Sequence, residues 1–363
     1  YEPPKEFAQW FSIPRGKEMI CQTTQGNDGY VDLYTYKTAD YMMTSANDFH
    51  PGEPGHQENP FQLTFNAVAQ LWVTHPGERV LFGAARPEQV IFTQNATHGL
   101  NIAIRTLVRP GSRVAISGYE HNAVTRVLHS IPDVAVTVVD APLFDPDAMA
   151  EGFAQALAQG ADAAVCNHVS NVFGAVAPVA EIAALCRARR VPLIVDASQS
   201  AGLLPVRLAE LGADFIGMPG HKALYGPQGT GLLLCARMPD TLLEGGSGSA
   251  SRLPDMPPEL PDHAEAGTQN VCGICGLAAG LRFVRRQTPQ RLLAHEIRLR
   301  RLLASMLEDI PGIRLFTGEA QSGTLSLCAA QTDCETLAAR LASEGICVRA
   351  GLHCAPLAHE SAG

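Results

Sequence analysis

Residues 191–201 have the sequence VPLIVDASQSA, an apolar and β-branched run that ends on Asp196. A short apolar run between turn signals is typical of a buried strand in an α/β sheet. In such sheets, ligands bind beyond the carboxyl ends of the parallel strands. We therefore expect the Asp196 carboxylate at a ligand-binding edge, although an aspartate after a strand serves as often as a helix cap or a metal ligand.

A lysine follows in a glycine-rich turn between two apolar runs, DFIGMPGHKALYGPQGTG at residues 214–231. Partial burial would lower the pKa of the Lys222 amine and leave it nucleophilic, as a Schiff-base lysine requires. An isolated turn lysine is more often a plain surface residue, but Asp196 followed by this turn is a more specific pattern. Because one carboxylate can hold a pyridinium nitrogen protonated, the pair indicates a pyridoxal phosphate site.

Short β-branched runs alternate with helical patterns from about residue 79 onward, which predicts an α/β fold with a mostly parallel, doubly wound sheet. Strands are expected at residues 89–92, 113–117, 135–139, 163–168, 192–196, 214–218 and 229–235, and helices at 99–108, 121–130, 146–159 and 179–189. A helical stretch from about 274 to 307 precedes a β-β-α-β pattern at 312–316, 324–329, 335–342 and 347–350, which predicts a small C-terminal α+β domain.

We place the domain change near residues 287–291, with a large domain at 79–287 and a small one at 288–363. Residues 1–78 show no helical or strand period over a useful window, and we expect an atypical N-terminal segment there. A glycine-rich and proline-rich loop at 244–261 is too long for a plain connection, and long loops of this kind are often functional.

The composition of the chain excludes several classes of protein. With 363 residues, 46% hydrophobic and 17% charged, it matches ordinary globular usage. A net charge of −9 without a basic stripe argues against nucleic acid or an anionic membrane as partner. No apolar run reaches the ~18–20 residues of a bilayer span and no secretion signal opens the chain, so we expect a cytoplasmic protein.

Ten cysteines are too sparse for a disulfide framework, so reduced thiols are expected. Cys166, Cys235 and Cys328 lie in apolar runs, where a thiol acts as a small buried hydrophobe. The pair in CGIC, residues 272–275, is similar to a redox or metal motif, but no second pair lies at ribbon spacing. We interpret that pair as structural and expect no metal site.

Two other turns follow expected strands. FTQNATHGLN at residues 92–101 opens a helix whose free amides can hold a phosphate, with Thr97 as the expected N-cap, and a plain capped helix is the alternative. GYEHN at residues 118–122 places His121 over the same sheet edge, where it could stack on a planar ring and transfer protons. A lone histidine is more often structural.

Together these motifs resemble the pyridoxal-phosphate enzymes of fold type I, the class V aminotransferase superfamily, and within it the cysteine desulfurases and selenocysteine lyases. The resemblance covers the chain from about residue 79 to its end. It is carried by GHKALYGPQGTG at 220–231, GGSGS at 245–249, AGTQN at 266–270 and RAGLHCAPL at 349–357. The order and spacing of these segments make coincidence implausible.

The resemblance implies a conversion of L-cysteine to L-alanine in a homodimer, with a persulfide on Cys354 that a sulfur-acceptor protein could take. Lys222 would form the Schiff base and remove the α-proton, and His121 would stack on the ring and assist. The implied cofactor contacts are Thr97, His98, His121, Asn171, Asp196, Gln199, His221, Lys222 and Thr268. Of these, Asp196 would bind the pyridine nitrogen, Gln199 the ring hydroxyl, and Thr97 and His221 the phosphate, while Thr268 would reach the phosphate of the neighbouring subunit.

Some features depart from the family pattern. Residues 1–78 lack the family's opening strand, although PGEPGH at 51–56 is similar to a turn of the desulfurases. The family continues beyond Gly363 with an arginine that binds the substrate carboxylate, so Arg349 is the candidate substitute beside Asn171. His98 stands where a glutamate is common, and Pro219 where many relatives have a hydroxyl.

Three alternatives to a cysteine desulfurase therefore stay open. The first is a selenocysteine lyase, which shares these residues. The second is another β-lyase or an aminotransferase in which Cys354 is idle. The third is a pyridoxal-phosphate-binding protein with weak or lost catalysis, because both ends of the chain are altered.

Overall fold

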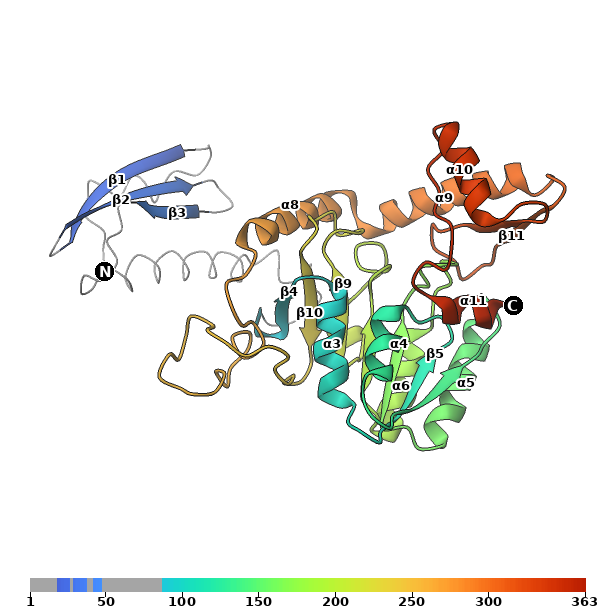
Figure 1. Cartoon of the computed structure of the whole chain (residues 1–363), viewed down its shortest axis with the longest axis horizontal. Coiled ribbons are helices and arrows are strands. Elements are labelled where there is room, and N and C mark those ends of the chain that lie inside the picture. The colour runs from blue at the N-terminus through green and yellow to red at the C-terminus, as the bar shows by residue number, and fades with distance from the viewer. Residues whose placement is uncertain (1–17, 27–28, 38–41, 48–86) are drawn as a thin grey trace. The chain divides into compact units, whose positions relative to one another are not determined.

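The computed structural model of the protein describes residues 18–26, 29–37, 42–47 and 87–363 (Figure 1). Internal contacts divide the chain into two compact units, Tyr1–Val80 and Leu81–Gly363. In the first unit, an antiparallel meander is formed by β1 (Glu18–Gly26), β2 (Gly29–Lys37) and β3 (Met42–Asn47). The PGEPGH turn at 51–56 lies outside the described residues.

The meander was not expected from the sequence, because residues 1–78 show no helical or strand periodicity. Tyrosine, valine and threonine in GYVDLYTYK favour a strand by propensity, but the apolar and polar residues do not alternate regularly. The periodicity of this segment therefore does not predict a strand.

The second unit contains a seven-stranded sheet in the order β4-β10-β9-β8-β7-β5-β6. The pairs β6–β5, β5–β7, β7–β8 and β8–β9 are parallel, while β10 runs antiparallel between β4 and β9. This arrangement confirms the mostly parallel sheet. The strands are β4 (Val90–Thr93), β5 (Arg113–Ser117), β6 (Ala135–Val139), β7 (Ala163–Asn167), β8 (Leu193–Asp196), β9 (Phe215–Pro219) and β10 (Gly231–Cys235).

Successive side chains of a strand point to opposite faces of the sheet. Most strands of this sheet are buried along their whole length, so they are covered on both faces. On β7, Val165 packs into one apolar core and Cys166 into the other, and both are 0% exposed. Full burial of an aliphatic side chain contributes about 1.5–3 kcal/mol, so the two cores account for much of the stability of the unit.

Helices cover both faces (Figure 1), which confirms the doubly wound layout. The core of Val165 is covered by α3 (Ala96–Leu107) and α4 (Asn122–His129). The core of Cys166 is covered by α5 (Pro146–Ala158), α6 (Val179–Arg189) and α8 (Val271–Gln287). The short elements η1 (Pro87–Gln89) and α7 (Leu208–Leu211) complete this part.

The C-terminal segment differs from the sequence expectation at two places. The helical stretch at 274–307 is two helices, α8 and α9 (Pro289–Leu307), because Thr288 has a φ of 66° and its hydroxyl caps α9. Residues 347–350 are not a strand: the described sheet here holds only β11 (Ile313–Phe316) and β12 (Ser326–Ala329), so no neighbouring strand offers a hydrogen-bond ladder. The remaining helices are α10 (Cys334–Ser343) and α11 (Pro356–Ala362).

Three cysteines were expected to be buried, and the expectation is confirmed for two of them. Cys166 and Cys235 are 0% and 2% exposed, inside the large sheet. Cys328 is exposed on β12, because the two-stranded sheet leaves that face uncovered. Across the described residues, no helix combines the length and the apolar character that a membrane crossing requires.

Candidate active site

The carboxyl ends of β7, β8 and β9 meet at one edge of the large sheet. Asp196 is the last residue of β8, is 4% exposed, and accepts a hydrogen bond at Oδ1 from the Ser198 amide at 2.9 Å. Asn167, the last residue of β7, is its partner in the strand register. Because β9 ends at Pro219, the turn with Lys222 begins at the same edge.

The charges of Lys222, Asp196 and His121 act on one another at this edge. Desolvation lowers the pKa of the Lys222 ammonium, and the Asp196 carboxylate opposes this by raising it. Desolvation also lowers the pKa of the His121 imidazole. The negative charge of Asp196 raises this pKa, and the positive charge of Lys222 lowers it. Lys222 is nevertheless an exposed residue, less buried than the sequence led us to expect, so a ligand can reach its amine.

His121 is the N-cap of α4, and its Nδ1 accepts a hydrogen bond from the Ala123 amide at 3.0 Å. A ring nitrogen that accepts carries no proton, so the neutral imidazole holds its proton on Nε2. Nε2 is therefore the atom that can donate a proton to a ligand, and the helix start fixes the ring.

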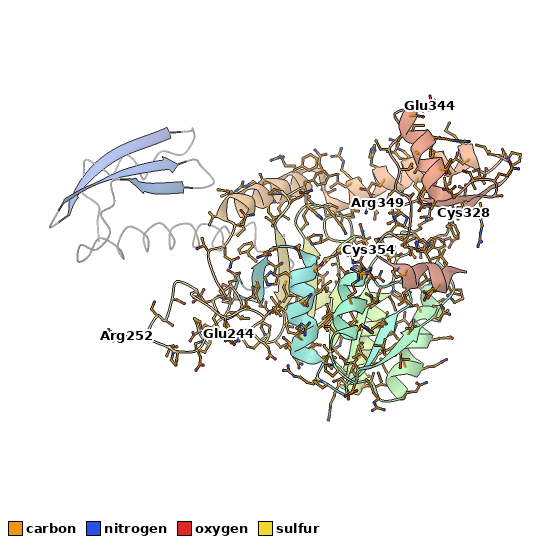
Figure 2. All side chains as sticks on the ribbon, viewed as in Figure 1. Glu244, Arg252, Cys328, Glu344, Arg349 and Cys354 are labelled. Carbon is orange, nitrogen blue, oxygen red and sulfur yellow. The ribbon has the colours of Figure 1, made fainter. Side chains whose placement is uncertain are left out.

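The loop with Cys354 is bonded to this same region. The Asn122 amide donates to the Cys354 carbonyl at 2.7 Å, and Asn171 Nδ2 donates to the His353 carbonyl at 2.9 Å. Cys354 is exposed beside the start of α4 (Figure 2) and lines one pocket together with Thr97 and His121. The structure thus brings these three predicted residues together.

The backbone of the loop is strained at two consecutive residues. His353 and Cys354 have φ angles of 52° and 56°, in the left-handed region that side chains other than glycine disfavour. Strain of this kind costs about 1–3 kcal/mol per residue and is found most often at functional sites. The two amide hydrogen bonds from Asn122 and Asn171 hold the loop in this conformation.

Three buried polar atoms near the strand ends lack a hydrogen-bond partner: Asn171 Oδ1, His168 Nδ1 and Ser200 Oγ. His168 follows β7, and Ser200 lies four residues after Asp196. A buried polar atom without a partner costs about 1–3 kcal/mol. A bound group with donors and acceptors at this edge would recover that cost, so these residues fit a polar ligand at the strand ends.

The start of α3 differs from the prediction in one respect. Its N-cap is Asn95, whose Oδ1 accepts from the His98 amide at 2.9 Å, and not Thr97, which is the second helical residue. Asparagine caps a helix as well as threonine does, so the sequence did not distinguish the two. The positive end of the helix still faces an anion placed beside Thr97.

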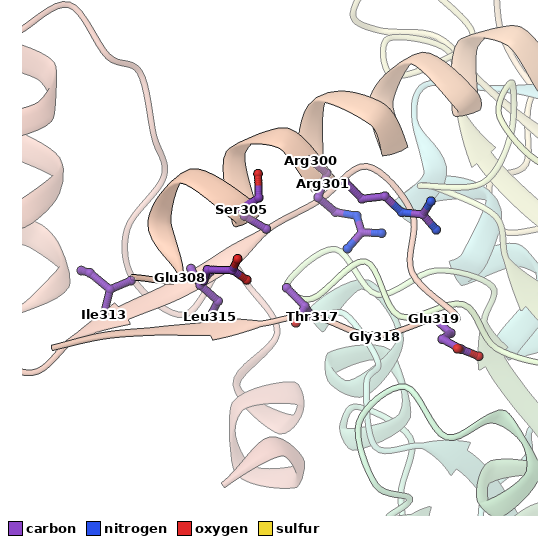
Figure 3. Close-up of a pocket in the computed structure, with 10 residues that line it drawn as sticks. Arg300, Arg301, Ser305, Glu308, Ile313, Leu315, Thr317, Gly318 and Glu319 are labelled. Carbon is purple, nitrogen blue, oxygen red and sulfur yellow. The ribbon is translucent and has the colours of Figure 1, made fainter. Parts of the chain in front are cut away.

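The other predicted residues are more dispersed. Thr268 and His98 line a separate pocket with Gln94, and burial lowers the pKa of the His98 imidazole. His221 is exposed and Gln199 is half-buried. A further hollow, between α9 and β11 (Figure 3), contains none of the predicted residues and is lined by Arg300, Arg301, Ser305, Glu308 and Glu319 among others.

Arg349 is exposed in the segment that leads to Cys354 (Figure 2). Burial lowers the pKa of the His353 imidazole, and the charges of His359 and Arg349 lower it further. The arginine therefore lies within electrostatic reach of the loop, although no hydrogen bond between described residues joins it to the pocket of Cys354.

A model of the aminotransferase class-V family matches residues 52–362, and the chain belongs to this family. The match begins before residue 79, so part of the segment that looked atypical, including most of PGEPGH, falls within it.

The chain is similar to several proteins named for one activity. It is 32% identical over 287 residues to a probable cysteine desulfurase of Mycolicibacterium paratuberculosis, and the matched region covers 75% of this chain and 42% of that protein. It is 29% identical over 347 residues to a cysteine desulfurase of Escherichia coli, with 88% of this chain and 82% of that protein covered. The chain spans about half the length of the first curated relatives it matches.

Solved structures support the fold. The apo cysteine desulfurase of Thermococcus onnurineus is 25% identical, with a TM-score of 0.69 over 78% of this chain and 74% of that one. A C-DES variant with glycine covalently linked to its PLP cofactor is 22% identical, with a TM-score of 0.68 over 80% and 81%. The chain therefore has the fold type I architecture that the sequence predicted.

Proposed function

We propose that the chain is a pyridoxal-phosphate-dependent cysteine desulfurase that converts L-cysteine to L-alanine and leaves the sulfur as a persulfide on Cys354. The observation that carries the proposal is the clustering of Lys222, Asp196 and His121 at one sheet edge, with Cys354 in the pocket that His121 lines. Membership of the class-V family and the names of the relatives support it.

The residues at this edge suit each part of pyridoxal phosphate. Asp196 would bind the pyridine nitrogen, Gln199 and Asn171 the ring hydroxyl, and His121 the ring face. The start of α3 with Thr97 and His98, together with His221, would hold the phosphate. Lys222 is the only lysine between residues 38 and 363, so it is the one side-chain amine in that span that can bond the cofactor aldehyde. When bound, the cofactor withdraws electrons from the α-carbon of the amino acid.

The protein side chains would supply the remaining chemistry. A lowered pKa makes the Lys222 ammonium easier to deprotonate, and the uncharged amine would take the α-proton, while His121 Nε2 would transfer a second proton. The Cys354 thiolate attacks the substrate sulfur: the Sγ–S bond forms as the carbon–sulfur bond breaks. The electron pair of the broken bond goes to the β-carbon, which becomes the methyl group of alanine after protonation.

The test is a product analysis of the purified chain with pyridoxal phosphate and cysteine. We expect a visible absorbance band, alanine in the supernatant and a persulfide on the protein. Pyruvate instead of alanine would identify a β-lyase. A strong preference for selenocysteine would identify a selenocysteine lyase, and bound cofactor without turnover would identify a binding protein. Each of these three results contradicts the proposal.

Arg349 would bind the substrate carboxylate, since a guanidinium fork is well suited to orient it. We expect Arg349→Ala to raise the KM for cysteine about tenfold or more, because charge-assisted hydrogen bonds contribute about 1.5–3 kcal/mol. Steady-state kinetics measure this, with Arg340→Ala on the exposed face of α10 as the control. An unchanged KM would assign the carboxylate to another group.

A homodimer is the expected assembly. Thr268 and the GGSGS segment at 245–249 are mostly exposed in the single chain, which leaves them free to complete the phosphate site of a second copy. Analytical sedimentation of the cofactor-loaded protein should show a dimer, and Thr268→Ala should weaken cofactor binding roughly tenfold. A monomer with full cofactor occupancy would contradict the shared site.

The remaining expectations extend this proposal. Residues 79–287 would form the large cofactor-binding domain and residues 288–363 the small one. A cytoplasmic location would keep Cys354 reduced between turnovers. The exposure of Cys354 would also let a sulfur-acceptor protein reach the persulfide.

A further inference from the structure

Glu120, the residue before His121, is a fully buried acid that the chemistry above does not use. It is 0% exposed. Its Oε1 lies 2.7 Å from Ser117 Oγ and accepts a hydrogen bond from the Asn167 amide, also at 2.7 Å, while Oε2 has no partner. Asn167 Nδ2 donates in turn to the Tyr119 carbonyl at 2.6 Å. The turn from Ser117 to His121 is thus tied to the end of β7.

The hydrogen-bond geometry requires one more proton than Ser117 can supply. Ser117 Oγ lies 2.7 Å from Glu120 Oε1 and 3.1 Å from Asn167 Oδ1, and both atoms are acceptors if Glu120 is ionised. The orientation of the Asn167 amide is fixed by its donation to Tyr119. A serine hydroxyl has a single proton, so it can serve only one of these two acceptors at a time. A proton on Glu120 Oε1, donated to Ser117 Oγ, would leave the Ser117 proton for Asn167 Oδ1 and satisfy both contacts.

This network connects the two groups that flank the proposed cofactor ring. Asn167 on β7 is the register partner of Asp196 on β8, and the two are the last residues of their strands. Glu120 accepts a hydrogen bond from the Asn167 amide, and it directly precedes His121, the N-cap of α4, in the chain. A displacement of Glu120 would therefore move His121 relative to Asp196.

We propose that Glu120 is a positioning residue: as an uncharged carboxylic acid it holds the His121 turn against the ends of β7 and β8, and so sets the place of His121 relative to Asp196. Its consequence for cofactor binding rests on the proposed function, whereas its effect on His121 does not. Sequence reasoning did not single out Glu120, because only its burial distinguishes it from a surface acid.

The surroundings of Glu120 favour the neutral form. Burial raises the pKa of Glu120 to about 8. A hydrogen bond that Ser117 donates to the ionised carboxylate lowers this pKa, and the charge of Asp196 raises it. The titratable groups whose charges couple to it are Asp196 on β8 and the Cys166 thiol on β7, and His121 is the next residue on its own turn. Among the described residues, no ion pair includes Glu120. Above pH 8 the acid would ionise beside Asp196 and the network would lose its proton.

The first test uses the protein without cofactor and follows the His121 ring by NMR with ¹³C-labelled histidine, assigned with His121→Gln. We expect a second inflection near pH 8 in the wild type and none in Glu120→Gln, which has the same shape but cannot ionise. Glu120→Leu should shift the His121 pKa upward toward its ordinary value. Glu181→Gln, an exposed acid of α6, is the control and should match the wild type.

The second test measures the affinity for pyridoxal phosphate between pH 7 and 9.5. The wild type should lose about tenfold more affinity over this range than Glu120→Gln, and Glu120→Leu should bind at least tenfold more weakly at pH 7. Identical His121 titrations in the wild type and Glu120→Gln, or parallel losses of affinity, would overturn the proposal even if Glu120→Leu does not fold. If the wild type binds no pyridoxal phosphate, the proposed function fails, and the His121 titration still decides the role of Glu120.

Discussion

Lys222→Ala should abolish the covalent bond between the protein and pyridoxal phosphate and reduce cysteine turnover by at least about four orders of magnitude. In the proposed mechanism the variant loses both the amine that bonds the cofactor and the base that takes the α-proton, and general base catalysis alone contributes about 10²–10⁴-fold. The measurement is borohydride reduction followed by peptide mass spectrometry, together with alanine formation. Noncovalent binding should persist, because Asp196 and the residues proposed to hold the phosphate are unchanged.

The sequence makes this experiment easy to interpret. The chain has four lysines, and only Lys222 lies within the residues matched by the family model, since the others are Lys5, Lys17 and Lys37. Lys37→Ala is the matched control and should retain the reduced adduct at Lys222. An adduct on any other lysine, or undiminished turnover in Lys222→Ala, would remove the basis of the site.

Cys354→Ala should eliminate the protein persulfide and lower alanine formation by at least about a thousandfold, because no other cysteine lines this described pocket to take the sulfur. Exchange of the cysteine α-proton with deuterium should continue, since the proposed mechanism assigns proton removal to Lys222 and not to the thiol. Persulfide is measured by alkylation and mass spectrometry, and exchange by NMR in D₂O.

Cys347→Ala provides the control, because Cys347 is an exposed thiol in the same segment and lines no described pocket with His121. It should keep the persulfide and the rate of the wild type. If Cys354→Ala retains full activity, the thiol is idle and the β-lyase or aminotransferase alternative is correct. If it loses α-proton exchange as well, Cys354 acts earlier than sulfur transfer and the division of roles proposed for Lys222 and Cys354 is wrong.

Glu120 shows how the fold creates chemistry from an unremarkable residue. In the sequence GYEHN, nothing in the neighbouring residues predicts that the acid before the histidine is buried or protonated. Packing of the turn against β7 removes water from the side chain, and the missing hydration raises its pKa to about 8. The same packing places its Oε1 at 2.7 Å from both Ser117 and Asn167, the latter 47 residues away.

The sequence by itself determined the strands at the centre of the sheet and the residues at their ends. VPLIVD and DFIGMP predict buried strands, because continuous apolar and β-branched runs are stable only when both faces are covered. Parallel pairing then places Asp196 and the Lys222 turn at one edge, as the register shows. The order of the motifs along the sequence also indicated the class V aminotransferase family, and the family match confirms that membership.

Only the tertiary structure decided features that depend on a distant partner. Residues 347–350 have a strand-like pattern but no strand beside them, so they form no ladder. The Cys354 loop keeps its left-handed backbone through hydrogen bonds from Asn122 and from Asn171, which lies 182 residues from its acceptor, His353. Local propensity describes how a segment can fold, whereas burial, hydrogen-bond partners and protonation arise from contacts between segments that the chain order does not specify.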